Sequence, residues 1–526
     1  MMWYFLLSLI PYFVYIVFKS KKYMHMLQQN WYNDGNRYLK WIMNNFEKVF
    51  MVFDVLFVIF AFFKNKNLII LSVIFYITAY IIHKNKVSKE QSKKPLVITA
   101  RIKRLYTTML ILHLLFIIPM LMFYTDANLP AYFVFYGLMC YINPFVIWIS
   151  NIINKPIEKM VFNHYKRMAK NKLYSMPNLK KIGITGSYGK TSTKNALNDI
   201  LNVKYNSFAT EKSFNTMNGL MISINNKLDK FSDVFVAEMG AFRRGEIQEK
   251  ANFIEPQYAI LTTIGTAHLE DFGCIENTQK AKFELIESLP KEGIAILNKD
   301  DEYQTSYKIK SKCKKVWVSM KFKEADVYAS NIKLSNKGTK FNVKFADTKT
   351  TIELETKLLG SANVYNVLQA VALAHELGLT DEQIKIGVKR IATIEHRLEL
   401  KKYADINIID DAYNSNPVGS KMAVDVLNMM PGKKIIVTPG MIELGNKQYE
   451  YNMQFGRHIA KVCDEVILIG EEQTKPILDG LKKEKYNEEK IHILNDVKKA
   501  FPLMKKLHEN ETYVLLENDL PDIFNE

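Results

Sequence analysis

A short glycine-containing segment carries residue types that bind phosphate. Its sequence is Gly186-Ser-Tyr-Gly-Lys-Thr-Ser192; a run typical of a strand, Lys180–Thr185, precedes it, and a helical pattern extends over residues 193–201. Glycines let backbone N–H groups face a phosphate, and the amino terminus of a helix adds positive potential. We therefore predict a phosphate-binding loop, in which Lys190 reaches the terminal phosphates of a nucleotide. The loop residues expected to bind are Gly186, Ser187, Gly189, Lys190, Thr191 and Ser192.

Hydroxyl and carboxylate groups near this loop are candidates for binding Mg²⁺. Thr191 and Ser192 directly follow the loop lysine, where a hydroxyl contacts the metal in phosphate-binding loops. Glu238 ends an apolar run, at the carboxyl end of a predicted parallel strand, where ligands collect. A hard carboxylate there suits Mg²⁺, and the alternative is a surface glutamate that caps a strand. His268 likewise follows an apolar run, residues 259–264, and is either a ligand or a structural histidine.

Apolar runs and helical patterns alternate through the rest of the carboxyl-terminal two thirds. Strands are predicted at 406–409, 434–437 and 466–469, with helices between them, which is typical of a doubly wound parallel sheet. Residues 325–354 alternate apolar and polar side chains and predict a β-rich insertion in the preceding domain. The fold class expected for this part is α/β.

The amino-terminal part has a different composition, dense in large apolar residues. A membrane-spanning helix needs about 20 apolar residues, with roughly 17 as the lower end. The second and third of five apolar stretches are short, so four spans remain an alternative to five. The second also contains Asp54, which is either functional or placed at a polar pocket or the interface. The stretches are residues 1–18, 49–63, 68–82, 106–124 and 132–149.

Basic residues predict the orientation of these spans. Lysines and arginines are abundant in 19–40 and 84–104, whereas 125–130 has none, so both basic loops are expected in the cytosol. The formal net charge of +17 fits anionic lipid better than nucleic acid, because many lysines adjoin the apolar stretches and no RNA-binding signature is present. Four cysteines without a C-x-x-C pair argue against a zinc ribbon or a disulfide framework and fit a reducing compartment.

From the loop onward the motifs resemble those of the Mur ligase family. The string T-G-S-x-G-K-T-S departs from the general G-x-x-x-x-G-K-[ST] spacing and is similar to the loop of these enzymes. Within the family, the MurF-type enzymes are the most similar, through A-H-L-E-D-F-G and D-D-A-Y-N-S-N-P. The matching segments are 210–219, 234–240, 264–273, 281–282, 293–301, 396–398, 410–417 and 441–445.

The resemblance implies roles for residues that spacing alone does not assign. His268 would bind a second Mg²⁺, and Lys282 would be carbamylated and act as a carboxylate near the metals; by spacing, Lys280 and Lys282 form only a solvated helix face. Asn363 and Asn366 resemble asparagines on the nucleotide side, although Asn363 could instead cap a helix. Arg397 and Asp411 would help close the carboxyl-terminal domain on ATP, the alternative being an interdomain ion pair, and Asn414, in the same motif as Asp411, would bind ATP.

Three departures from the MurF-type pattern bear on the substrate. Ala362 stands where a histidine usually precedes the first asparagine, and Gly440 stands where an acid is usual. Nothing before residue 180 resembles the domain that grips the UDP-sugar end of the acceptor. We therefore expect an acceptor that is lipid-linked or otherwise gathered at the membrane.

The expected activity is an ATP-dependent, ADP-forming ligation. Joining a carboxylate to an amine at neutral pH requires activation, which an acyl phosphate made from ATP provides, so ATP and Mg²⁺ are the expected cofactors. The resemblance implies a peptidoglycan-precursor acceptor and D-Ala-D-Ala or a similar amino-acid donor. Alternatives are a ligase of the poly-γ-glutamate synthase type, a modifier of lipid-linked wall precursor, and a non-catalytic ATP-binding membrane protein.

The predicted organisation has four parts, and no nucleic-acid partner is expected. A transmembrane helical domain of about five spans is followed by a basic connector, a central ATP-binding domain and a Rossmann-like carboxyl-terminal domain. This arrangement predicts a multi-pass protein of the cell membrane with its catalytic part in the cytoplasm. The parts are residues 1–150, 151–177, 178–395 and 396–526.

Overall fold

The computed structural model of the chain divides into two compact units, Met1–His164 and Tyr165–Glu526. Each unit is described by itself. The described residues are 2–30, 32, 36–50, 68–87, 95–123, 125, 129–267, 269–413, 415–442 and 444–519.

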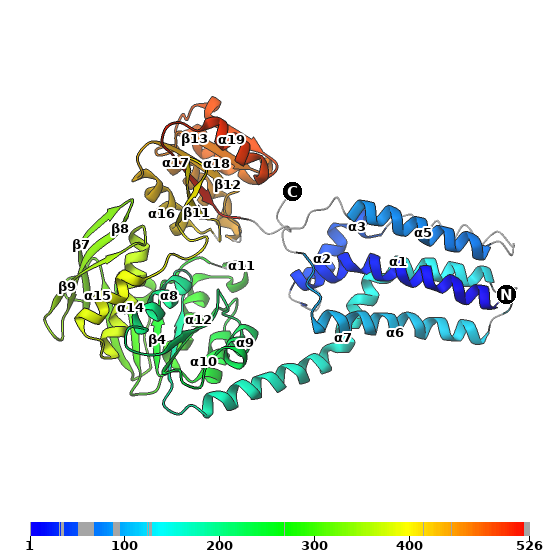
Figure 1. Cartoon of the computed structure of the whole chain (residues 1–526), viewed down its shortest axis with the longest axis horizontal. Helices are drawn as coiled ribbons and strands as arrows, with labels where there is room; N and C mark the ends of the chain where they lie inside the picture. The colour runs from blue at the N-terminus through cyan, green and yellow to red at the C-terminus, as the bar shows by residue number, and fades with distance from the viewer. Residues whose placement is uncertain are drawn as a thin grey trace. The chain divides into compact units, whose positions relative to one another are not determined.

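The first unit is built of helices (Figure 1). Their shared core is rich in tyrosine. Tyr12, Tyr15, Tyr38, Tyr76 and Tyr136 are among its largest fully buried side chains. The core includes polar contacts, since Tyr12 Oη lies 2.9 Å from His113 Nδ1. The helices are α1 (Met2–Gln29), α2 (Asn36–Asn44), α3 (Phe46–Val49), α5 (Leu68–Val87), α6 (Ala100–Met122) and the first part of α7 (Leu129–Tyr174).

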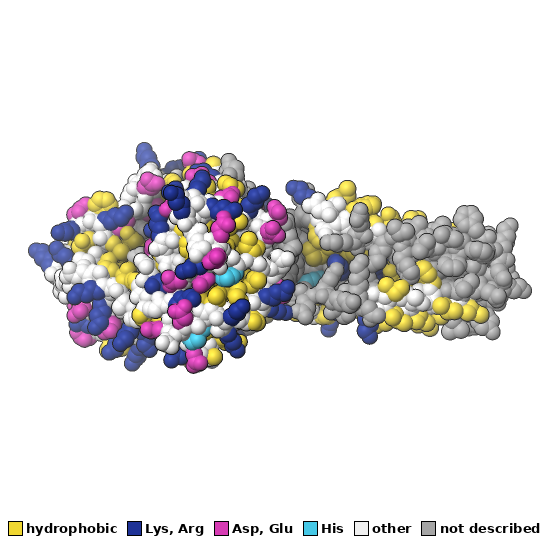
Figure 2. Space-filling view, turned by 90° about the horizontal axis from the view of Figure 1, so that it is seen from above, with side chains coloured by type: hydrophobic (Ala, Val, Ile, Leu, Met, Phe, Trp, Pro, Cys, Tyr) yellow, Lys and Arg dark blue, Asp and Glu magenta, His cyan; other side chains and the backbone are white. Residues whose placement is uncertain are grey.

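Four of the five predicted spans correspond to helices. Among the described residues, two helical segments, Ala100–Pro119 and Val134–Tyr174, are long and apolar enough to cross a bilayer by length and composition; Val73–Ile82 is a shorter apolar helix. Figure 2 shows hydrophobic side chains along the described surface of this unit, whereas basic and acidic side chains are spread over the surface of the other. Most of the predicted span 49–63, including Asp54, lies outside the described residues. The number of spans therefore stays a prediction.

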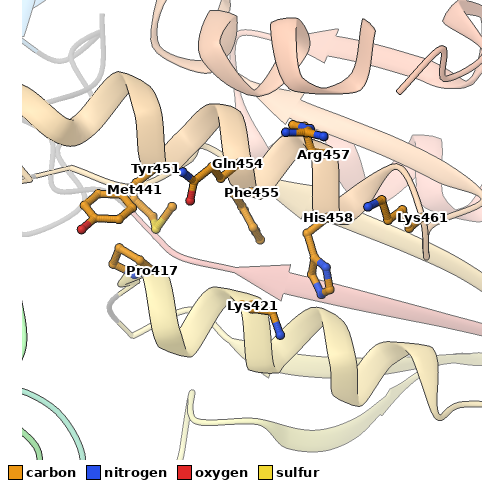
Figure 3. Close-up of a pocket in the computed structure, with 9 residues that line it drawn as sticks. All are labelled: Pro417, Lys421, Met441, Tyr451, Gln454, Phe455, Arg457, His458 and Lys461. Carbon is orange, nitrogen blue, oxygen red and sulfur yellow. The ribbon is translucent and has the colours of Figure 1, made fainter. Parts of the chain in front are cut away.

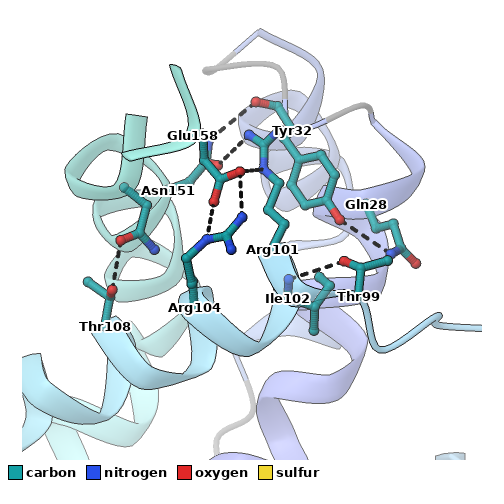
Figure 4. Close-up of polar contacts among 10 residues, drawn as sticks. Gln28, Tyr32, Thr99, Arg101, Ile102, Arg104, Thr108, Asn151 and Glu158 are labelled. Carbon is teal, nitrogen blue, oxygen red and sulfur yellow. Dashed lines mark hydrogen bonds and ion pairs between the residues drawn. The ribbon is translucent and has the colours of Figure 1, made fainter. Parts of the chain in front are cut away.

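Polar contacts join α1, α6 and α7 at one end of the helical unit (Figure 4). Arg104 donates two hydrogen bonds to Glu158, at 2.7 and 2.9 Å. The guanidinium of Arg101 stacks 3.8 Å from the ring centroid of Tyr32. α7 continues as one helix to Tyr174, so most of the predicted basic connector is helical.

The second unit contains a nine-stranded sheet in the order β2-β3-β1-β4-β5-β6-β7-β8-β9. Strands β1 to β7 pair in parallel, and β7, β8 and β9 pair antiparallel. The predicted β-rich segment is thus confirmed, and it extends this sheet. The strands are β1 (Lys180–Thr185), β2 (Ser207–Ala209), β3 (Val234–Glu238), β4 (Tyr258–Leu261), β5 (Ile294–Asn298), β6 (Lys314–Ser319), β7 (Val327–Ser335), β8 (Gly338–Phe345) and β9 (Thr351–Thr356).

Helices cover both faces of this sheet, as expected for a parallel sheet. Apolar residues of α8 (Lys190–Leu201), α14 (Ser361–Glu376) and α15 (Asp381–Arg390) form one core with the strands. On the other face α12 packs so closely that a Cβ on Gly183 of β1 would lie 2.7 Å from Leu285 Cδ1. The remaining helices are α9 (Met217–Asn226), α10 (Glu246–Ile254), α11 (Leu269–Phe272), α12 (Ile275–Glu287) and α13 (Glu302–Thr305).

A six-stranded sheet follows, in the order β10-β11-β15-β12-β13-β14, parallel except for β10. The three strands predicted from sequence are β11, β12 and β13, so the doubly wound α/β prediction is confirmed. Helices α16, α17 and α18 cover one face and α19 the other. The bounds are β10 (Glu399–Tyr403), β11 (Ile406–Asp411), β12 (Lys433–Thr438), β13 (Glu465–Ile469), β14 (Ile491–Leu494), β15 (Thr512–Glu517), α16 (Pro417–Asn428), α17 (Gln448–Ile459), α18 (Glu471–Lys483) and α19 (Ala500–Leu507).

Candidate functional site

The predicted phosphate loop lies at the carboxyl end of β1, which pairs with β3 on one side and β4 on the other and is the third strand from the β2 edge of the first sheet. Helix α8 begins at Lys190, three residues earlier than the helical pattern suggested. Its N-cap is Gly189, with φ +81°, a residue without a side chain that could cap the first amides. The amino-terminal N–H groups of α8 are therefore available to an anion, which fits the predicted phosphate site.

The glycines of the loop are also required by close packing. A Cβ on Gly186 would lie 1.9 Å from Thr262 Oγ1, and one on Gly189 would lie 2.4 Å from Asn366 Oδ1. Ser187 Oγ accepts from the N–H of Gly265 and donates to its carbonyl, both at 3.0 Å. The loop is thus hydrogen-bonded to the segment after β4 and packs closely against α14.

Lys190 folds back on the loop. Its ammonium donates to the carbonyls of Gly186 and Ser187 at 2.8 and 3.0 Å. Burial lowers its pKa to about 8, with Glu238 raising and Arg397 lowering it. The side chain therefore stays protonated at neutral pH and can compensate phosphate charge.

Glu238 ends β3 inside the protein. Its side chain is 1% exposed, which excludes the surface alternative. Thr191 Oγ1 donates to its Oε2 at 2.9 Å, and Asn215 Nδ2 donates to its Oε1 at 3.1 Å. Ser192 is also buried. The Thr191 and Glu238 oxygens form a small, hard donor set next to the loop.

Lys194, which the sequence analysis did not single out, pairs with Glu238. The Lys194 ammonium lies 3.4 Å from Glu238 Oε2, both side chains are 1% exposed, and the ammonium also donates to the carbonyl of Lys212. Residues three or four apart share a helix face, so Lys190, Thr191 and Lys194 point to one side of α8. That spacing could have indicated a second lysine at the site.

Replacing Lys194 by methionine should destabilise the protein by about 3–5 kcal/mol, because removing one partner of a buried ion pair leaves an uncompensated charge. The measurement is chemical unfolding of the full-length protein in detergent, with Lys227→Met on an exposed position as control. The double variant with Glu238→Gln should recover much of the loss, since it removes the orphaned charge. If Lys194→Met lowers the free energy of unfolding by less than about 1 kcal/mol, the pair contributes no more than a surface salt bridge, and the prediction is wrong.

Lys282 is buried, which makes the solvated-face interpretation from spacing wrong. It lies on α12, is 3% exposed, and its Nζ is 5.4 Å from the ring centroid of Phe272. Burial lowers the pKa of Lys282 well below its usual range, and the charges of Lys190 and Lys250 lower it further. The structure therefore brings Lys282 within electrostatic reach of the loop lysine and favours a neutral amine.

The asparagines of α14 lie on the other side of the loop. Asn366 Oδ1 accepts from Thr193 Oγ1 at 3.2 Å, and its Nδ2 donates to Asn363 Oδ1 at 3.1 Å. Asn363 donates to the carbonyl of Leu359 at 2.8 Å, and Gly360 is the N-cap of α14. Asn363 is thus not the N-cap, and the pair forms a polar edge beside Gly189.

Arg397 reaches the loop from the carboxyl-terminal part. Its Nη2 donates to Thr191 Oγ1 at 3.3 Å, and its guanidinium lies 4.6 Å from the ring centroid of Tyr413. Asp411 accepts from the N–H of Leu398 at 3.2 Å, and burial raises its pKa to about 6. In the described part of the chain, no ion pair joins Arg397 or Asp411 to the preceding domain.

His268 and Asn414 lie outside the described residues. Among those described, no group of three or more His, Cys, Asp or Glu side chains could hold a metal ion. Two protein oxygens, from Thr191 and Glu238, nevertheless fit Mg²⁺, which keeps several waters and phosphate oxygens in its coordination sphere.

At Gly440, where the resemblance predicts an acid, the backbone has φ +82° and a Cβ would lie 2.9 Å from Asn452 Oδ1. A buried acid stands nearby on a neighbouring strand, which the sequence analysis missed. Glu517 Oε2 accepts from Thr438 Oγ1 at 2.8 Å, and that hydroxyl accepts from the N–H of Gly440 at 3.0 Å. Ser415 Oγ also donates to Glu517.

Burial raises the pKa of Glu517 from 4.5 to about 8. Between these pH values the folded protein binds a proton that the unfolded chain has lost, so stability should fall as pH rises, by up to ~1.4 kcal/mol per unit. Glu517→Gln cannot ionise at this position and avoids this loss. The unfolding temperature of the variant, relative to that of the wild type, should therefore rise as pH increases from 5 to 8. That of Glu509→Gln, at an exposed position, should not. Parallel pH profiles of wild type and Glu517→Gln would contradict the buried acid.

A pocket of about 330 Å³ lies between α16 and α17 (Figure 3). None of its lining residues belongs to the loop or to the Glu238 cluster. It is lined by Pro417, Lys421, Met441, Tyr451, Gln454, Phe455, Arg457, His458 and Lys461.

Two family profiles match this chain: the Mur ligase middle domain over residues 184–374, and the Mur ligase, glutamate ligase domain over residues 396–517. The UDP-N-acetylmuramoyl-tripeptide–D-alanyl-D-alanine ligase of Escherichia coli (strain K12) is 32% identical over 295 residues, 55% of this chain and 64% of the relative. The enzyme of that name from Buchnera aphidicola subsp. Acyrthosiphon pisum (strain APS) is 32% identical over 334 residues, which cover 62% of this chain and 73% of the relative.

A crystal structure of MurF from Acinetobacter baumannii superposes with a TM-score of 0.62 at 26% identity, covering 68% of this chain and 77% of that one. The chain thus spans just under two thirds of the E. coli relative, and the two profile matches begin after the helical unit. With the matching fold, loop and relatives, the chain belongs to the Mur ligase family.

Proposed function

We propose that this chain is an ATP-dependent, ADP-forming ligase that adds D-Ala-D-Ala, or a similar amino-acid donor, to a peptidoglycan precursor. The observation that carries the proposal is the contact of Arg397 with Thr191, beside Lys190 and the buried Glu238. This contact links Arg397, in the region matched by the carboxyl-terminal profile, to Thr191, in the loop of the region matched by the middle-domain profile. The names of the relatives support the donor and the acceptor class.

The residues take the following proposed roles. The loop 186–192 binds the phosphates of ATP; Asn363, Asn366, Arg397, Asp411 and Asn414 lie on the nucleotide side. Mg²⁺ would be held by Thr191, Glu238, His268 and the carbamate of Lys282. When bound, the ion neutralises phosphate charge.

The reaction has two balanced steps. A carboxylate oxygen of the acceptor attacks the terminal phosphoryl group of ATP, and ADP leaves. The amine of the donor then attacks the acyl carbon, phosphate leaves and the nitrogen loses a proton. Lys190 compensates charge on the transferred group, because a fixed cation placed where charge develops costs no reorganisation.

We further propose that residues 1–150 are a membrane domain of about five spans in the cell membrane, 151–177 a basic connector, and 178–395 and 396–526 cytoplasmic catalytic domains. The apolar helices support the membrane placement. The profile matches leave the helical unit unassigned, which supports an acceptor that is lipid-linked rather than gripped by a UDP-binding domain.

The test is ADP release by the full-length protein in lipid and by residues 165–526, each with UDP-linked and lipid-linked precursors and a panel of D-amino-acid and dipeptide donors. The full-length protein should prefer the lipid-linked acceptor, and residues 165–526 should bind ATP but use both acceptors poorly. Equal efficiency of both proteins on the UDP-linked precursor would make the helices a simple anchor. Glutamate as the preferred donor would favour the poly-γ-glutamate alternative, and no turnover with any pair would favour a non-catalytic protein.

A further inference from the structure

The helical unit carries an apolar groove that the ligase chemistry does not use. Its volume is about 610 Å³. Val14 of α1 and Leu114 of α6 are 50% and 44% exposed, so the groove opens to the outside of the unit. It is lined by Phe13, Val14, Val17, Phe18, Tyr80, Leu110 and Leu114, from α1, α5 and α6.

Contacts between the helices show which parts of α1, α5 and α6 lie at the same end of the groove. The rings of Phe18 and Tyr80 pack edge to face with centroids 4.9 Å apart, and Ser20 Oγ lies 3.1 Å from Met109 Sδ. The carboxyl-terminal halves of α1 and α5 therefore meet the amino-terminal half of α6 at the same level.

Beyond this end of the groove, each of the three helices carries a lysine. Lys21 follows Val17 by one turn on α1, Lys84 follows Tyr80 by one turn on α5, and Lys103 lies two turns before Leu110 on α6; all three side chains are exposed. Lys84 Nζ lies 5.9 Å from the ring centroid of Tyr80, so this ammonium adjoins the groove itself.

At the opposite end the exposed side chains stay apolar. Ile10, one turn before Val14 on α1, is 61% exposed, and Ile118, one turn after Leu114 on α6, is 49% exposed. The surface thus changes along one line from hydrocarbon to three positive charges. This is the complement of a lipid that has a long chain and an anionic headgroup.

We propose that the groove holds the chain of a phosphate-bearing lipid, with its phosphate at Lys21, Lys84 and Lys103. The inference rests on the proposed function and deepens it: the lipid is the anchor of the acceptor. Residues 13–18 span roughly 8 Å of helix, so the groove grips the part of the chain next to the headgroup.

Lysines beside spans also follow from the usual excess of basic residues in cytoplasmic loops, so exposure to bulk lipid must be separated from a site. The distinguishing property is selectivity for phosphate. The full-length protein in phosphatidylcholine vesicles is photolabelled with a long-chain prenyl monophosphate that carries a diazirine near the headgroup, and with the matching neutral alcohol. Labelled residues are mapped by mass spectrometry.

The phosphate probe should label the groove at least tenfold more than the alcohol, since each lysine near an anionic headgroup favours binding about fivefold. The triple variant Lys21→Gln, Lys84→Gln and Lys103→Gln should bring the ratio near one. Lys159→Gln, an exposed lysine on α7, which contributes no residue to the groove, should leave it unchanged. Val14→Trp with Leu114→Trp should reduce labelling by both probes, because the tryptophans fill the groove.

Labelling of Ile70 and Ile74, exposed on α5, by the alcohol reports that a variant is folded and inserted; if the triple variant fails this check, Lys84→Gln alone is used. A wild-type ratio near one, or a ratio that the lysine variants leave unchanged, overturns the proposal in favour of bulk lipid. Photolabelling needs no turnover, so that result leaves the ligase assignment in place. Selective labelling without any ADP release would support a lipid-phosphate site in the groove but contradict the assignment of that lipid as the anchor of the acceptor.

Discussion

Replacing Lys190 by alanine should lower acceptor-dependent ADP release by about 10²–10³-fold, the usual cost of losing one electrostatic donor at a developing charge. The lysine begins α8, and its ammonium is held by two loop carbonyls, those of Gly186 and Ser187. The charge is thus already at the site before the nucleotide binds.

Three measurements make this result specific. ADP release is followed with saturating ATP, so that kcat separates from weakened binding. Lys227→Ala, at an exposed position on the same unit, should keep wild-type turnover. The unfolding curve of Lys190→Ala should stay close to that of the wild type, because its ammonium makes hydrogen bonds to carbonyls but no ion pair among the described residues. Normal turnover in Lys190→Ala would remove the phosphate-loop assignment.

The elements of the α/β unit could be predicted because their signals are local. The apolar run Lys180–Thr185 and the glycines after it lie next to one another in sequence, and the structure shows the expected strand, loop and helix. The strands of the carboxyl-terminal sheet were likewise found from short apolar runs between helical patterns. In each case the residues that determine the element are the residues that form it.

The contacts of the site could not be predicted in this way, because they join distant segments. Asn366 contacts Thr193, and Lys194 meets Glu238 only after β1 and β3 pair. Spacing assigned Lys282 to a solvated face, since a helix pattern shows which residues share a face but not which face a neighbouring sheet covers. The family resemblance identified Lys282 as a candidate site residue, and only the structure showed that its side chain is buried.

Lys282→Ala should be nearly inactive, and a small carboxylic acid such as acetate should partly restore turnover, because the missing group is then a negative charge rather than an ammonium. Burial and the charges of Lys190 and Lys250 lower the pKa of Lys282, so the amine is neutral over a wider pH range. Only a neutral amine attacks carbon dioxide; the new N–C bond forms as the nitrogen gives up one proton.

The same neighbours favour the product, since two ammonium groups that destabilise a third cation stabilise a carbamate anion. Turnover of the wild type should therefore fall when carbon dioxide and bicarbonate are removed and return when bicarbonate is added, whereas Lys282→Ala should respond to acetate and not to bicarbonate. Lys280→Ala, two residues away and exposed, is the matched control and should behave as wild type. Full activity of Lys282→Ala, or equal losses in both variants, would show that this buried lysine serves packing alone.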